Sequence, residues 1–101
     1  MSMIYHNLRA IEILLVEDSK SDAGIMIETF NESKILNHIH LARNGVEALD
    51  FLYKRGKYQN VSRPDLILLD LNLPKKNGRE VLEEIKKDED LKTIPVVILT
   101  T

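Results

Sequence analysis

Residues Pro64 to Gly78 have the sequence PDLILLDLNLPKKNG, and this stretch decides the fold. The unbroken apolar run Leu66 to Leu69 is typical of a strand that is covered on both faces, as in a parallel sheet. The run stops at Asp70, and a loop marked by proline and glycine then leads to an amphipathic helix that begins near Arg79. In open α/β sheets, ligands bind at the carboxyl ends of strands. Asp70 is therefore either a functional carboxylate or simply the end of a strand and the cap of a turn.

The composition is that of an ordinary globular domain. A chain of 101 residues with 44% hydrophobic and 30% charged residues predicts one domain, and a net charge of −2 argues against a nucleic-acid partner. No run approaches the ~18 apolar residues of a membrane span, and the N-terminal segment lacks the apolar core of a signal peptide. We therefore expect a cytoplasmic protein without a membrane partner. Cysteine is absent, so any metal must be held by oxygen ligands or by the three histidines.

Three further segments have the pattern of strands. Ile11 to Val16 is a second buried apolar run, and it ends directly in Glu17 and Asp18. His38 to Leu41 alternates polar and apolar residues, which is typical of a sheet edge, and Val96 to Leu99 predicts a fourth buried strand. Strands and helices alternate along the chain. This order predicts an α/β fold with a doubly wound parallel sheet and right-handed crossovers.

The helices are marked by their caps. Ser19, with Asp22 three residues later, resembles a capping box and opens the first helix. Asn44 precedes residues at helical spacing and is interpreted as an N-cap. That helix is expected to end near Lys54, Arg55 and Gly56, with basic residues in its last turn and glycine at its end.

Four polar side chains follow the predicted strands and should meet at one edge of the sheet. They are Glu17, Asp18, Asp70 and Thr100. Three carboxylates repel one another by about 4 kcal/mol per pair at ~4 Å and an effective dielectric constant near 20, unless a cation joins them. A hard divalent ion, most plausibly Mg²⁺, removes this repulsion and can bind a phosphoryl group. Asp70 could then attack phosphorus while the Thr100 hydroxyl neutralises an equatorial oxygen.

Four separated segments carry a family resemblance: ILLVEDS, ARNGVEAL, PDLILLDLNLPKKNGREVL and PVVILTT. Together they resemble the response-regulator receiver domain of two-component signalling, from Ile11 to the end of the chain. The segment FLYKRGKYQNVSRPD is similar to a variant found in single-domain regulators that are paired with phytochrome-type kinases.

The resemblance implies a role for each site residue. Asp70 would be the phosphoacceptor for a phosphohistidine kinase, so the domain would not itself be an enzyme. Asp18 and Asp70 would ligate Mg²⁺, Glu17 would act through water, and Asn72 would offer its backbone carbonyl. Thr100 would be the switch hydroxyl. The implied fold is flavodoxin-like, with strand order 2-1-3-4 over the strands present, and the implied partners are a sensor histidine kinase and a downstream protein target.

The match stops after the fourth strand. A full receiver continues with a fourth helix, a fifth strand bearing a Lys, and a fifth helix, so residues 1–101 would be an incomplete receiver domain. We expect the Val96 to Leu99 edge to be unpaired, and the chain to be a fragment or a homodimer joined through this edge. Phosphotransfer would lack the Lys that contacts the phosphoryl group in a full receiver. Lys75 and Lys76 are not expected to replace it, because both are expected to be solvated.

Two other functions remain open. A non-signalling adaptor or fragment could retain the acidic metal pocket. An aspartate-nucleophile phosphatase would need a second Asp two residues after Asp70, and Asn72 at that position cannot act as an acid or base. A flavin-binding module is disfavoured, because Glu17 and Asp18 would repel phosphate.

The histidine pair is a weaker candidate. His38 and His40 could bind metal, but they lack an evident third ligand and are expected to face solvent.

Overall fold

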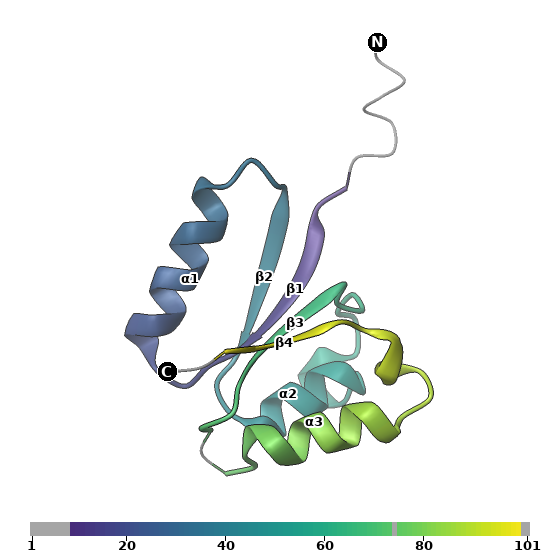
Figure 1. The fold of residues 1–101 in the computed structure, drawn as a ribbon. Coiled ribbons are helices and arrows are strands. Elements are labelled where there is room, and N and C mark those ends of the chain that lie inside the picture. Colours follow the sequence, from purple (N-terminus) through teal and green to yellow (C-terminus); the bar gives the residue numbers. More distant parts are fainter. Residues whose placement is uncertain (1–8, 74, 100–101) are drawn as a thin grey trace.

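The computed structural model describes residues 9–73 and 75–99, which form a four-stranded parallel sheet with helices on both faces (Figure 1). The strand order is β2-β1-β3-β4, as predicted. Among the described residues, no helix combines the length and the apolar character needed to cross a membrane. The elements in chain order are β1 (Ile11–Val16), α1 (Lys20–Glu32), β2 (Asn37–Ala42), α2 (Gly45–Leu52), β3 (Leu66–Asp70), α3 (Gly78–Lys87) and β4 (Val96–Leu99).

The two central strands are apolar on both sides because helices cover both faces of the sheet. Leu14 and Leu15 of β1 are fully buried although their side chains point to opposite faces, and Ile67 and Leu68 of β3 repeat this pattern. The predicted buried strands are therefore confirmed at β1 and β3. The predicted burial of the fourth strand was wrong: β4 forms, but its residues are partly buried or exposed, because within the described residues it pairs only with β3. Within residues 9–73 and 75–99, β2 and β4 each pair with a single neighbour, and the β2 edge agrees with its mixed sequence.

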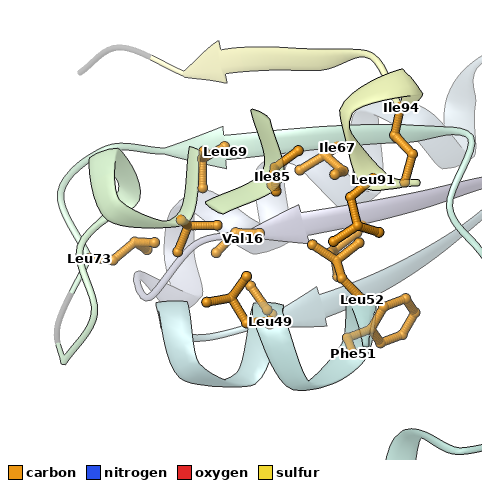
Figure 2. Packing of buried hydrophobic residues seen from close by; sticks show 14 residues of the cluster. Val16, Leu49, Phe51, Leu52, Ile67, Leu69, Leu73, Ile85, Leu91 and Ile94 are labelled. Atoms are coloured by element: carbon orange, nitrogen blue, oxygen red, sulfur yellow. The ribbon is translucent and has the colours of Figure 1, made fainter. Parts of the chain in front are cut away.

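The core has two layers. On one face α1 packs Ala23, Met26 and Phe30 against Ile13 and Leu15. The other face carries the larger cluster, in which side chains of α2 and α3 meet those of β1 and β3. Figure 2 shows this second layer from close by, and its labelled members are Val16, Leu49, Phe51, Leu52, Ile67, Leu69, Leu73, Ile85, Leu91 and Ile94.

Side-chain caps open the three α-helices of the described residues, and the sequence had suggested the first two. The Ser19 hydroxyl accepts the Asp22 N–H at 3.2 Å, and Asn44 Oδ1 accepts the Glu47 N–H at 2.9 Å. A reciprocal capping box is formed at α3 by Asn77 and Glu80. These caps fix where each helix leaves the carboxyl edge of the sheet.

The predicted end of the second helix was wrong. Helix α2 ends at Leu52, and Lys54, with φ 56°, takes the left-handed position that the sequence had assigned to Gly56. The Lys54 N–H donates to Phe51 O at 3.1 Å and the Arg55 N–H donates to Asp50 O at 2.8 Å, which is a Schellman closure. The basic residues therefore lie beyond the helix instead of in its last turn.

Two glycines allow the loop after β3 to pack tightly. A Cβ added at Gly45 would overlap the Lys76 carbonyl oxygen, so α2 begins directly against this loop. A Cβ at Gly78 would overlap the Asp70 carbonyl oxygen and lie 2.5 Å from Leu71 Cα. Because both close contacts involve backbone atoms, neither can be relieved by a change of rotamer.

We predict that Gly78→Ala lowers the free energy of unfolding by about 2 kcal/mol, because the added methyl group displaces the backbone next to Asp70. Gly24→Ala is the matched control, since Gly24 lies within α1 and a Cβ added there would have no other atom within 4 Å. This control should stabilise the protein by roughly 0.5–1 kcal/mol. Urea unfolding followed by circular dichroism measures both changes. Equal unfolding midpoints for the two variants would contradict the close approach at Gly78.

Candidate metal centre

Three carboxylates converge where β1 and β3 end. Val16 pairs with Leu69, so Glu17 and Asp70 leave neighbouring strands at the same level of the sheet. One carboxylate oxygen from each of Glu17, Asp18 and Asp70 lies within 4.8 Å of the others. The convergence predicted from the strand ends is therefore observed.

Glu17 is a buried acid, with only 4% of its surface exposed. Its Oε2 accepts the Ser19 N–H at 3.1 Å, at the start of α1. Burial raises the pKa of Glu17, the Ser19 hydrogen bond lowers it, and the Asp70 carboxylate raises it further, with a net upward shift. A cation at this edge would favour the ionised form of Glu17.

Asp70 is also buried, with 5% of its surface exposed. Its Oδ1 accepts the N–H of Asn72 at 2.9 Å, and this bond orients the carboxylate at the end of β3. The Asn72 side chain itself is exposed. That the Asn72 carbonyl faces a metal ion stays a prediction.

Asp18 differs from the other two acids because it is exposed. The cluster thus has two buried carboxylates against the sheet and one on the solvent side, so an ion can enter from water. Carboxylate oxygens without nitrogen or sulfur ligands suit a hard divalent cation that keeps some of its waters. The fit to such an ion is good, since a cation would offset both the burial and the Asp70 repulsion that raise the pKa of Glu17.

The last predicted site residue, Thr100, lies outside the described residues. Its neighbour Leu99 is the final residue of β4 and pairs with Asp70 across the sheet.

Of the two lysines in the loop after β3, one does not behave as expected. Lys75 is exposed, in agreement with the sequence. Lys76 is only partly exposed, and its Nζ lies 2.9 Å from Glu84 Oε1, so the prediction of a solvated Lys76 was wrong. The Glu84 hydrogen bond raises the pKa of Lys76. The pairing arises because α3 folds back beside the loop, which the sequence order does not reveal.

This ion pair borders a cavity of about 410 Å³ between α2, α3 and the loop. The residues lining it are Val46, Leu49, Asp50, Tyr53, Arg55, Lys76 and Glu84. The acidic cluster does not contribute to this cavity. Lys76 is thus directed toward α3, and its contact with Gly45 joins the loop to α2.

Comparisons with known proteins all point to one family. The model of the response regulator receiver domain matches residues 13–101. Response regulator Rcp1 from Synechocystis sp. is 57% identical over 89 residues, which are 88% of this chain and 60% of that protein.

Solved structures agree with this match. The phosphorylated cyanobacterial phytochrome response regulator RcpA is 53% identical with a TM-score of 0.88, over 92% of this chain and 66% of that one. The Mn²⁺-bound form of Rcp1 is 56% identical with a TM-score of 0.87, over 90% and 66%. The chain thus spans about 60% of the length of the curated relative Rcp1.

We predict that the acidic cluster makes stability depend on divalent ions. In EDTA, Asp70→Asn should raise the free energy of unfolding by about 1 kcal/mol, because one of three adjacent charges is removed. In millimolar Mg²⁺ the native chain should be more stable than the variant, since only the native chain gains the full free energy of Mg²⁺ binding. Urea unfolding in the two buffers measures this reversal.

Asp50→Asn is the matched control, because Asp50 is a partly buried carboxylate on α2 that pairs with Arg55, away from the cluster. It should respond to Mg²⁺ as the native chain does. An Asp70→Asn variant that Mg²⁺ stabilises as much as the native chain would rule out the cluster as the binding site.

Proposed function

Because the chain belongs to the response regulator receiver family, we propose that it is a phosphoryl-accepting switch of a two-component system, with Asp70 as the acceptor. The observation that carries this proposal is the buried Asp70 carboxylate beside Glu17 and Asp18 at the carboxyl edge of a parallel sheet. The chain covers only part of its relatives' length, so the proposal concerns this pocket and not the output of a longer protein.

The proposed cofactor is Mg²⁺. Its ligands would be Asp18, Asp70 and the backbone carbonyl of Asn72, with Glu17 acting through a water molecule. The acidic cluster supports this assignment, as does the similarity to an Rcp1 structure that is described as Mn²⁺-bound. When bound, the ion would neutralise charge on the phosphoryl oxygens during transfer.

In the proposed reaction, a carboxylate oxygen of Asp70 attacks the phosphorus of a phosphohistidine. The new P–O bond forms as the P–N bond breaks, and the kinase imidazole leaves with its electron pair and takes up a proton. The Asn72 N–H holds one Asp70 oxygen at 2.9 Å, which leaves the second oxygen as the nucleophile. The chain is thus the substrate of a kinase and not an enzyme. The solvent-exposed side of the acidic cluster, at Asp18, is the proposed entry for the phosphoryl donor.

The proposed partners are a sensor histidine kinase of the phytochrome type and a downstream protein target, with the exchange in the cytoplasm. Similarity to a phytochrome response regulator supports the kinase class. Thr100, outside the described residues, is the proposed switch hydroxyl that would couple the phosphoryl group to a two-state surface.

A second copy of the chain is a further proposed partner, through the free edge of β4. Val97 of this strand is 48% exposed, and β4 pairs only with β3 within the described part of the chain. Unpaired strand edges readily pair with another chain. Sedimentation that shows only monomers at high protein concentration would exclude this dimer.

Phosphotransfer is tested by intact-mass spectrometry after incubation with acetyl phosphate and Mg²⁺. The native chain should gain the mass of one phosphoryl group, and Asp70→Asn should gain none. Asp50→Asn, the carboxylate control on α2, should be modified like the native chain. A folded, Mg²⁺-binding native chain that stays unmodified would overturn the proposal and leave a non-signalling adaptor with a retained pocket.

A further inference from the structure

A second group of side chains of metal-ligating types lies at the opposite end of β1 from the acidic cluster, with its ligand atoms more widely spaced than those of the cluster. Glu12 Oε1 is 3.1 Å from His38 Nδ1, and Glu12 Oε2 is 3.1 Å from His40 Nε2. The sequence pattern offered two histidines at alternate positions without a third ligand. The pairing of β1 with β2 supplies that ligand, because Glu12 lies directly opposite His38.

We propose that Glu12, His38 and His40 form a binding site for a borderline transition-metal ion such as Zn²⁺, separate from the acidic cluster. Residues 12 and 17 are five positions apart on an extended strand, which is about 16 Å. The two sites can therefore be loaded independently.

The chemistry of the ligands distinguishes the two sites. Imidazole nitrogen suits Zn²⁺, Cu²⁺ and Ni²⁺, whereas a cluster of oxygens alone suits Mg²⁺. Zn²⁺ binds His nitrogen and carboxylate oxygen at about 2.0–2.2 Å, so two of its ligands lie about 3.0–3.4 Å apart at right or tetrahedral angles. Each ring nitrogen lies 3.1 Å from a different oxygen of Glu12, so each His and Glu12 are within the range of two ligands of one ion, while the two rings must still move closer together.

The surrounding structure holds two of the three ligands in place. The Glu12 carboxylate side chain is only 18% exposed, and the Glu12 N–H donates to Asp65 Oδ2 at 2.8 Å. Asp65 is itself paired with Arg9 at 2.9 Å. The His40 ring, 37% exposed, packs against Phe51 of α2 with ring centroids 5.1 Å apart.

His38, the third ligand, is exposed enough to rotate toward the other two ligands. The two rings contact different oxygens of Glu12, so a single ion needs one ring to turn toward the other. His38, with a side chain 66% exposed, can make this rotation without displacing the core.

Zn²⁺ itself is the probe, titrated calorimetrically into the native chain with Mg²⁺ at saturation. We expect one Zn²⁺ per chain, and the same binding in Asp18→Asn, which alters only the acidic cluster. His38→Gln, His40→Gln and Glu12→Gln should each weaken Zn²⁺ binding at least about tenfold, since each removes one of three ligands. His6→Gln, which removes the remaining histidine of the chain, is the matched control and should bind like the native protein.

Nitrogen chemical shifts of the imidazole rings provide the second readout, and circular dichroism confirms that each variant is folded. Zn²⁺ should shift the ring nitrogens of His38 and His40 together, at one equivalent. Binding that is lost in Asp18→Asn, or that survives in His38→Gln and His40→Gln with native affinity, would overturn the proposal. Failure of phosphotransfer to Asp70 has no bearing on it, because that reaction uses a different site.

Discussion

The parallel pairing of β1 with β3 is the constraint on which the rest of the structure depends. Both strands are buried between helical layers, so their polar residues are confined to the points where the strands leave the core. In that register Glu17 and Asp70 become neighbours, and neither can turn fully into water. The packing of the helices thus holds two carboxylates close together with little exposure to water. A cation can offset the resulting repulsion.

The loop after β3 serves this edge in two ways. It orients Asp70 through the Asn72 N–H, and it brings α3 back so closely that Gly78 has no space for a side chain. The same loop contacts the start of α2 at Gly45, and the Lys76 to Glu84 ion pair closes it against α3. Asp70 is thus connected to α2 and α3 through the close contacts of one loop.

The opposite end of β1 follows different chemistry. There Glu12 faces the two histidines of β2, beside the Asp65 and Arg9 pair, in an environment that is only partly buried. In the proposed arrangement, oxygen ligands at one end and mixed nitrogen and oxygen ligands at the other would suit two kinds of ion.

The sequence by itself determined the fold class and the three acids of the cluster, because apolar runs that stop at carboxylates fix both burial and strand ends. The strand order followed from the resemblance to a known family. The sequence also determined the cap at Asn44, which is a local interaction. Only the tertiary structure decided which acids are buried and that Lys76 meets Glu84. It alone brought Glu12 to His38. These features depend on the register of strands and on contacts between segments far apart in the chain, which local patterns of polarity do not encode.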